Sequence, residues 1–357
     1  MSPSRELKAL DLFSGIGGFR AGTVGLDCPI QFVAYSELDK YPAQCYAAMF
    51  GDDEVNLGDI KLITRRSEEK FDLGFLKPES WRTDQICQAI PEHDILFAGF
   101  PCQAFSKMGK EGGVNDVLGR GNLLFDIVEI LRVKRPKFFV LENVDGFATH
   151  EEGRLLRKSE EMLATLGYST CAWRLNAADY GVPQNRNRVF IVGKHDVSQM
   201  LLTPTKVSRN GYASTVHRIL ERKVHNRYYL SEQIKPTILS NGTGGWSAKA
   251  AINQSPARPL CKTMHKMHRA SQDNYYSDSY IHGKWSEDLG VVIQGKSGSD
   301  RIRRITPKEA LRIQGFSEDL VDKAIASGLS DTRLYMAAGN AVPPPLVRSV
   351  LLAILPP

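Results

Sequence analysis

Short apolar runs alternate with segments of helical periodicity through the first 193 residues. The runs typical of strands are 8–13, 30–35, 94–98, 137–141 and 188–193. Between them, 123–133 and 155–166 carry apolar residues at three- and four-residue spacing, which predicts amphipathic helices. Strands that alternate with helices favour an α/β fold built on a doubly wound, mostly parallel sheet.

The pattern changes after residue 194. Residues 205–300 are polar, contain scattered glycines and show no long helical periodicity, which indicates a smaller, loop-rich or β-rich domain. A helix begins again at Thr306, because Thr306-Pro307-Lys308-Glu309 is a capping-box sequence with proline at the first helical position. The apolar stretch 343–355 predicts a last helix that returns to the large domain. The expected domains are a large one, 1–193 plus 332–357, and a small one, 194–331.

Composition agrees with this division and narrows the class of protein. A chain of 357 residues suits one large and one smaller domain. No run approaches about 18 consecutive apolar residues, and the N-terminus lacks the apolar segment of a secretory signal. Six cysteines, at 28, 45, 87, 102, 171 and 261, show no C-x-x-C pairs or other metal-ligand spacing. These features favour a cytoplasmic protein with reduced thiols, no membrane span and no bound metal.

Positive charge is concentrated in one segment. Residues 194–300 contain 15 Lys and Arg against 8 Asp and Glu, although the whole chain carries a formal charge of only +6. A basic surface confined to one region is typical of a polyanion-binding site. A solvated basic face without a partner would give the same count, so charge alone leaves both interpretations open.

A glycine-rich turn follows the first strand, at Ser14-Gly15-Ile16-Gly17-Gly18. Glycines allow a tight turn and let a ligand approach the backbone closely. The next strand ends near Glu37, which is spaced to bind a ribose diol, and a third strand end is expected near Asp59, whose carboxylate could accept from an adenine amino group. The turn departs from the G-x-G-x-x-G pattern of dinucleotide sites. It therefore favours a nucleoside without a pyrophosphate, such as S-adenosylmethionine.

A second turn, Gly99-Phe100-Pro101-Cys102, directly follows the strand 94–98. This position places the Cys102 thiol at the edge of the sheet, where open α/β folds carry their chemistry. A thiolate is a strong nucleophile, and backbone N–H groups or a nearby cation would lower the thiol pKa. A lone cysteine is more often a small buried residue, so the turn alone does not establish a nucleophile.

Taken together, the motifs of the chain resemble those of cytosine-5 DNA methyltransferases of the bacterial restriction–modification type. They occur in the order of that family and extend over residues 11–346. The motifs are Asp11-Leu12-Phe13-Ser14-Gly15-Ile16-Gly17-Gly18, Gly99-Phe100-Pro101-Cys102-Gln103, Glu142-Asn143-Val144, Gln184-Asn185-Arg186-Asn187-Arg188, Arg304-Ile305-Thr306-Pro307-Lys308-Glu309, Arg312-Ile313-Gln314-Gly315-Phe316 and Gly339-Asn340-Ala341-Val342-Pro343.

The resemblance implies a fold and a reaction. The fold is that of S-adenosylmethionine-dependent methyltransferases, with a target-recognition domain at 194–331. Cys102 would attack C6 of a cytosine flipped out of duplex DNA, and C5 would take the methyl group of S-adenosylmethionine. Glu142 would bind the N3 and N4 edge of the base and Arg188 its O2. Arg186 would support Cys102 or contact the DNA backbone.

The same resemblance assigns two sets of binding residues. Those expected to contact the cofactor are Phe13, Gly15, Ile16, Gly17, Gly18, Glu37, Leu38, Asp59, Ile60, Pro101, Leu123, Asn340 and Ala341. Those expected to contact DNA are Ser106, Lys107, Arg258, Lys262, Lys266 and Arg269.

Two alternatives use the same fold. A tRNA-methylating branch also has a Pro-Cys nucleophile but a much reduced recognition region, whereas this chain has about a hundred residues there. A silent DNA-binding regulator would be expected to lack Cys102, Glu142 or the arginines, and all are present. The expected partner is double-stranded DNA, with a cognate restriction endonuclease as a functional partner, and a monomer suits an enzyme that acts on one strand at a time.

Overall fold

The computed structural model describes residues 6–64, 80–101, 123–195, 201–207, 215–243, 246–286, 288–294 and 300–355. The predictions made for Cys102, Ser106 and Lys107 fall in 102–122, outside the described residues.

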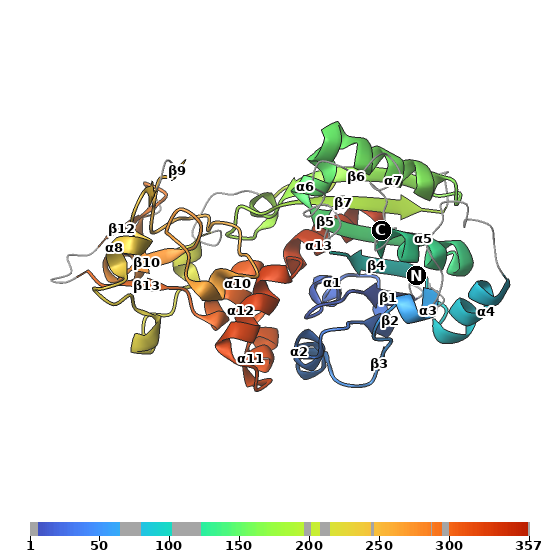
Figure 1. Ribbon diagram of the computed structural model, residues 1–357, viewed down its shortest axis with the longest axis horizontal. Helices are drawn as coiled ribbons and strands as arrows, with labels where there is room; N and C mark the ends of the chain where they lie inside the picture. Colours follow the sequence, from blue (N-terminus) through green and yellow to red (C-terminus); the bar gives the residue numbers. More distant parts are fainter. Residues whose placement is uncertain are drawn as a thin grey trace.

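A seven-stranded sheet forms the large lobe, with strand order β3-β2-β1-β4-β5-β7-β6 (Figure 1). Its strands are β1 (Leu7–Leu12), β2 (Ile30–Ser36), β3 (Val55–Asn56), β4 (Ile95–Gly99), β5 (Phe138–Val144), β6 (Ser169–Asn176) and β7 (Asn187–Lys194). The first five are parallel, and β7 runs antiparallel to both β5 and β6. The predicted mostly parallel sheet is therefore confirmed.

The sequence pattern did not predict β6. This edge strand is only half-buried over its first four residues, Ser169 to Ala172, so it lacks the apolar run that marked the inner strands. The two-residue strand β3 is exposed at the opposite edge and ends at Asn56, before the Asp59 expected at a strand end. The sequence pattern alone therefore did not locate either edge strand of the sheet.

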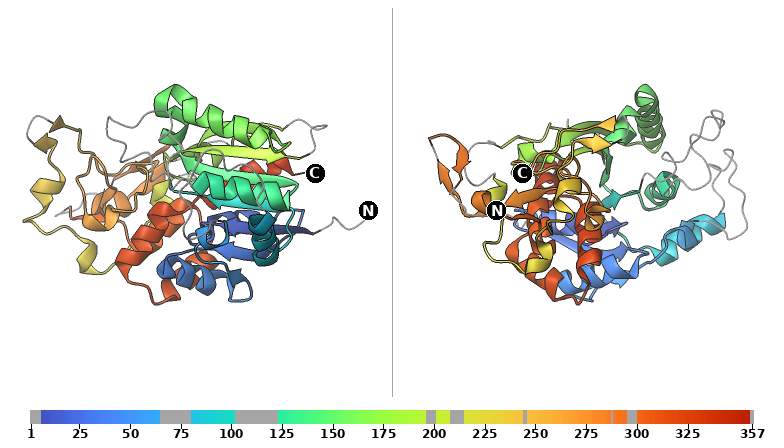
Figure 2. Two further views of the ribbon diagram at one scale, coloured as in Figure 1. Left: turned by 45° about the vertical axis from the view of Figure 1, so that its right-hand side comes forward. Right: turned by 60° about the vertical axis from the view of Figure 1, so that its left-hand side comes forward.

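Helices cover both faces of the sheet, as Figures 1 and 2 show. One apolar cluster joins alternate strand residues, among them Leu10, Leu12 and Leu141, to helices on one face. A second cluster joins Ala9, Phe97 and other intervening residues to helices on the opposite face. The helices of the first cluster are α3 (Lys61–Thr64), α4 (Ser80–Ala89), α5 (Leu123–Lys134), α6 (Asp145–Thr149) and α7 (Arg154–Ala164). Those of the second are α1 (Gly18–Thr23) and α13 (Pro344–Ile354).

The order of the strands fixes where a ligand can bind. From β1 the chain moves outward to β2 and β3, then crosses to β4 on the other side of β1. Strand connections that leave in opposite directions open a crevice beyond the carboxyl ends of β1 and β4. The glycine turn follows β1 and Pro101 follows β4, so the described parts of both motifs begin at this crevice.

The second lobe contains only short elements and lies at the other end of the molecule in Figure 1. Its strands and helices are α8 (Lys235–Ile238), β8 (Gly242–Thr243), β9 (Trp246–Ser247), β10 (Tyr275–Ser277), α9 (Asp278–Ile281), β11 (Lys284–Ser286), β12 (Val291–Ile293) and β13 (Ile302–Arg304). Four small segments contribute to its own apolar cluster, through Leu230, Ile238, Ala270 and Tyr275. This agrees with the loop-rich domain expected there.

Three helices lie between the two lobes: α10 (Pro307–Gln314), α11 (Glu318–Ala326) and α12 (Asp331–Asn340). The capping box predicted for α10 is present, with Thr306 and Glu309 bonded reciprocally. The apolar cluster around these helices includes Ile16 and Met49 from the large lobe and Tyr276 from the small one. Because this core extends across the expected boundaries, the domain limits stay a prediction.

One segment, 331–354, is long and apolar enough by length and hydropathy to cross a membrane. In the structure it consists of α12 and α13, separated by residues 341–343, and 67% of its most apolar window is buried in the protein. Its hydrophobic residues pack against the sheet and against α10, as those of a core helix do.

Candidate active site

The turn after β1 adopts a conformation that glycine allows. Gly15 and Gly17 have positive φ angles of 56° and 78°, and Phe13 between β1 and the turn has a φ of 55°, which is unusual for a residue with a side chain. The Ser14 N–H donates to Ser36 O at 3.0 Å, which ties the turn to the end of β2. A Cβ atom at Gly15 would meet nothing within 4 Å. The turn therefore faces open space, as a ligand-binding turn must.

Glu37 lies beside this open space. Its carboxylate accepts hydrogen bonds from Gly15 N at 3.0 Å and from Asp39 N at 2.7 Å. Burial raises the pKa of Glu37, and these backbone donors oppose that rise. The sequence did not single out Asn56, whose Oδ1 accepts from Glu37 N at 3.0 Å and fixes the backbone that carries the acid.

Not every residue expected at the cofactor directs its side chain outward. Leu38 is 72% exposed and Pro101 is exposed, so both side chains are accessible. Ile16 and Ile60 are each 1% exposed and pack inside apolar clusters. Only the backbone of these two isoleucines is available to a ligand, because their side chains fill the core.

The remaining cofactor candidates border the same crevice. Asp59 caps α3 through its Oδ1, which accepts from Lys61 N at 3.1 Å, and Leu123 begins α5 half-buried. Asn340 is exposed at the last turn of α12, and Ala341 after it is buried. These positions are compatible with contacts to one ligand at the carboxyl ends of β1 and β4.

The start of α1 packs tightly against the chain between α12 and α13. A Cβ atom at Gly18 would lie 2.3 Å from Val342 O, and one at Gly22 would lie 2.6 Å from the Val347 side chain. Glycine at these two positions therefore lets the start of α1 pack directly against Val342 and the beginning of α13.

We expect Gly18→Ala to destabilise the protein by about 1–3 kcal/mol, because the added methyl group must displace the Val342 backbone. Urea denaturation measures this loss, and calorimetric titration with S-adenosylmethionine should show weakened binding. Gly146→Ala is the matched control, since a Cβ there meets nothing within 4 Å. Equal stability of the two variants would contradict the close packing at Gly18.

These features fit S-adenosylmethionine. An open glycine turn suits close contact with an uncharged part of the ligand, and the Glu37 carboxylate can accept bonds from ribose hydroxyls. A pyrophosphate would face this carboxylate at short range, which the charge disfavours. The open turn and the carboxylate beside it thus suit a nucleoside that carries no phosphate.

Glu142 lies on β5 beside the end of β4. It is paired in register with Gly99, and a Cβ atom at Gly99 would lie 3.7 Å from Glu142 Oε2. Arg188 Nε lies 2.8 Å from Glu142 Oε1, and both side chains are largely buried. Burial raises the pKa of Glu142, and the charges of Arg188 and Arg186 lower it in part. Such a carboxyl group can take up a proton more readily than an exposed glutamate.

Asn143 supports the approach to the predicted nucleophile. It is 2% exposed, and its Nδ2 donates to Phe100 O at 3.1 Å. Its Oδ1 accepts from Val144 N at 2.9 Å. Asn143 thus links the end of β5 to the peptide just before Pro101, two residues before Cys102. The motif contained this residue, but nothing in its local sequence indicated the long-range bond.

Arg186 differs from the role expected for it. Its side chain is 1% exposed and donates to Leu260 O at 2.7 Å, Gly339 O at 3.0 Å and Ala341 O at 3.1 Å. Burial, together with repulsion from Arg188, lowers the pKa of Arg186 to about 9. A guanidinium buried among carbonyl groups is not available to the DNA backbone, so that part of the expectation is wrong. Any contact with Cys102 lies outside the described residues.

A buried amide pair supports the same junction. Gln184 is fully buried, accepts from Leu260 N at 2.8 Å and donates to Gln314 Oε1 at 3.1 Å. Gln314 in turn donates to Ala338 O. Together with Arg186, these side chains connect the start of β7 to α10, to α12 and to the segment at Leu260. The sequence motifs included both glutamines without indicating that they meet.

Four of the residues expected to bind DNA, Arg258, Lys262, Lys266 and Arg269, lie on one short segment of the small lobe. Lys262 and Lys266 are exposed around a single 3-10 turn, whereas Arg258 and Arg269 are partly buried. The backbone at Arg258 is held by Asn274, through bonds of 2.8 and 3.1 Å. The two lysines therefore remain the better candidates for phosphate contacts.

Comparisons with known proteins match this geometry. A family model described as C-5 cytosine-specific DNA methylase matches residues 7–355. The Type II methyltransferase M.NgoBI of Neisseria gonorrhoeae is 35% identical over 344 residues, which are 96% of this chain and 91% of that protein. M.NlaX of Neisseria lactamica is 33% identical over 345 residues, 96% of this chain and 94% of that protein.

Two solved structures share the fold. The Entamoeba histolytica methyltransferase EhMeth has a TM-score of 0.70 at 18% identity and covers 97% of each chain. The Dnmt2 methyltransferase of S. pombe has a TM-score of 0.69 at 16% identity, with coverage of 98% of this chain and 97% of its own. From the family match and from relatives above 30% identity, the chain belongs to the C-5 cytosine-specific DNA methylases, which use S-adenosylmethionine as the methyl donor.

Proposed function

We propose that this methyltransferase modifies one cytosine within a specific duplex DNA sequence and that Cys102 is its nucleophile. The observation that carries this proposal is the buried Glu142–Arg188 pair at 2.8 Å, beside the end of β4. Phe100, which follows β4 and comes two residues before Cys102 in the sequence, accepts a hydrogen bond from Asn143, the neighbour of Glu142. The base-binding groups on β5 thus lie beside the end of β4, after which the sequence places the predicted nucleophile.

Each of these residues has a role in one step of the methyl transfer. The Cys102 thiolate adds to C6 of the flipped cytosine while Glu142 supplies a proton to N3, so that C5 becomes nucleophilic. Arg188 fixes the Glu142 carboxyl group and reaches the O2 side of the base. S-adenosylmethionine would supply the methyl group that C5 takes and would leave as S-adenosylhomocysteine. Loss of the C5 proton to a base then expels the Cys102 thiolate, and return of the N3 proton to Glu142 gives the neutral aromatic product and resets the acid.

Duplex DNA is favoured over tRNA as the substrate. The relatives above 30% identity are named Type II methyltransferases, whereas the likeness to the Dnmt2 structure, at 16% identity, concerns the fold alone. Transfer of labelled methyl groups from S-adenosylmethionine to duplex DNA, with tRNA transcripts in parallel, tests this choice. Incorporation into RNA alone would overturn it. Bisulfite sequencing of DNA from cells that express the protein would then identify the recognition sequence.

Glu142→Gln should lower kcat about 100- to 1,000-fold, because the amide keeps the shape of the carboxyl group but cannot give a proton to N3. A carboxyl group that must be protonated loses activity as the pH rises through its pKa, which burial here raises above 4.5. The wild-type rate should therefore carry a falling limb at higher pH that the glutamine variant lacks. An unchanged pH–rate profile in Glu142→Gln would contradict the acid role.

Glu152→Gln provides the control for this experiment. Glu152 is an exposed carboxylate in the turn before α7, and the same chemical change there should leave both the rate and its pH dependence unaltered.

The names of these relatives, Type II methyltransferases, support a restriction–modification role for the enzyme. We infer that it acts in the cytoplasm, protects DNA against a cognate restriction endonuclease, and works as a monomer. Transformation of a host that expresses the endonuclease, with and without this gene, tests the protective role.

A further inference from the structure

A group of metal-binding side chains lies on the segment that carries the predicted DNA contacts. The Cys261 Sγ, a ring nitrogen of His268 and a carboxylate oxygen of Asp273 all lie within 4.8 Å of one another. The spacing of these residues along the chain matches no common zinc motif, and sequence reasoning expected no metal. From this arrangement we propose that the three side chains form a Zn²⁺ site that closes the loop 261–273.

The geometry needs little change to bind zinc. The His268 Nδ1 lies 3.2 Å from Asp273 Oδ2. Bonds of about 2.0–2.3 Å in a tetrahedral site place the ligand atoms roughly 3.3–3.6 Å apart, so nitrogen and oxygen are already near that separation. The Cys261 side chain must approach by about 1 Å. It is exposed and makes a weak side-chain contact to Thr263 Oγ1 at 3.5 Å.

The backbone holds two of the ligands in place. The Asp273 carboxylate also accepts from His268 N at 2.7 Å, and its side chain is only 9% exposed. Met267 has a positive φ of 54°, which reverses the chain directly before His268. A non-glycine residue in this conformation is strained, and such strain persists where surrounding contacts maintain it. The loop is therefore shaped so that His268 and Asp273 meet.

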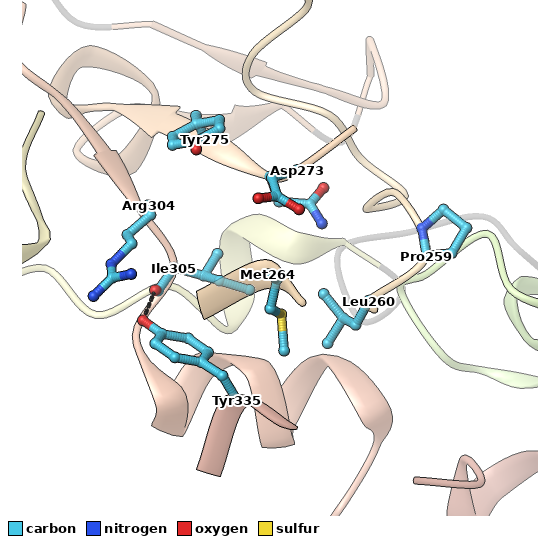
Figure 3. A pocket seen from close by; sticks show the side chains of 9 residues that line it. Pro259, Leu260, Met264, Asp273, Tyr275, Arg304, Ile305 and Tyr335 are labelled. Atoms are coloured by element: carbon cyan, nitrogen blue, oxygen red, sulfur yellow. Dashed lines mark hydrogen bonds between the residues drawn. The ribbon is translucent and has the colours of Figure 1, made fainter. Parts of the chain in front are cut away.

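The donor set points to zinc among the common divalent ions. A thiolate and an imidazole favour Zn²⁺ over Mg²⁺ and Ca²⁺, which prefer oxygen ligands. Asp273 and Arg304 also line the pocket of Figure 3. A water molecule would complete a four-coordinate zinc site. One thiolate and one carboxylate neutralise the ion, so binding places no net charge beside Arg304.

The consequence for the enzyme depends on the function proposed above. Lys262 and Lys266 lie between the first two ligands, and Arg269 lies between the second and third. A bound ion would restrain the backbone that carries these side chains. It would therefore affect how the enzyme distinguishes one DNA sequence from another, without changing the proton transfer at Glu142.

Metal binding is measured on the full-length protein without DNA or S-adenosylmethionine, so failure of the proposed methylation leaves this test intact. Dialysis against micromolar Zn²⁺, followed by elemental analysis, should give one equivalent per chain. Titration with Co²⁺ should give a near-ultraviolet thiolate-to-metal band. Hydrogen exchange at amides 262–272 should slow when Zn²⁺ is added.

Cys261→Ser should abolish the cobalt band, and His268→Gln should weaken Zn²⁺ binding at least tenfold. Cys87→Ser, an exposed cysteine on α4, and His265→Gln, a histidine within the same loop, are matched controls that should keep one equivalent. Circular dichroism verifies that each variant is folded. Folded wild-type protein that takes up no stoichiometric metal, or a cobalt band that survives Cys261→Ser, would overturn the proposal.

Discussion

Cys102→Ala is expected to lower methyl transfer by a factor on the order of 10⁴ or more, because no other group can then make the bond to C6. The turn before this residue is rigidly placed: Phe100 is 4% exposed and its carbonyl is bonded to Asn143. Loss of the thiol removes the covalent step but none of these contacts. We therefore expect S-adenosylmethionine to bind the variant as it binds the wild type, which calorimetry can measure.

Covalent trapping gives the most direct readout for this prediction. Duplex DNA with 5-fluorocytosine at the target position carries fluorine in place of the C5 proton, so the final elimination cannot occur. The wild type should form a complex that survives denaturing electrophoresis, and Cys102→Ala should form none. Cys87→Ser, exposed and on α4, should behave as the wild type in both assays. Methylation that persists in Cys102→Ala would exclude this thiol as the nucleophile.

Arg303→Met is expected to destabilise the protein by about 3–5 kcal/mol, because it leaves the buried carboxylate of Glu309 without its cation. The pair is enclosed: the two side chains are 1% and 0% exposed, and both guanidinium nitrogens bond to the carboxylate, at 2.6 and 2.8 Å. Glu309 also accepts from Glu221 N and Thr306 N, so it cannot turn toward water without breaking the cap of α10.

A neighbouring ion pair supplies the control. Arg312 on α10 bonds to Glu318 at the start of α11, but that carboxylate is 60% exposed, so Arg312→Met should cost no more than about 1 kcal/mol. Urea denaturation of both variants measures the difference. The double variant Arg303→Met with Glu309→Gln should recover part of the loss, because no unpaired charge remains. Equal effects of Arg303→Met and Arg312→Met would show that burial does not decide the strength of these pairs.

Local sequence was most informative where a residue's role depends on its near neighbours. The apolar runs located five strands within three residues of their observed ends, because strands buried on both faces need continuous apolar side chains. Thr306 and Glu309 predicted the start of α10, since both members of a capping box lie within one turn. The Gly15 turn was recognisable because a positive φ favours glycine.

Local sequence was less informative where the position of a side chain depends on partners that are distant along the chain. Arg186 was expected near Cys102 or DNA, yet its partners at Leu260, Gly339 and Ala341 are 74 to 155 residues away along the chain. Asn143 is 43 residues from the carbonyl that it holds. No local periodicity encodes such contacts, which exist only after the segments have packed.

By itself, the sequence determined the fold class, the order of the motifs and the chemical groups available to bind a nucleoside and attack a cytosine. The tertiary structure decided the environment of those groups. It buried Glu142, which raises the pKa of the carboxyl group, and placed Arg188 beside it, which lowers that pKa in part; it also brought Cys261, His268 and Asp273 within 4.8 Å of one another. The physical reason is that pKa values and ligand geometry depend on burial and on through-space distance, which the fold sets.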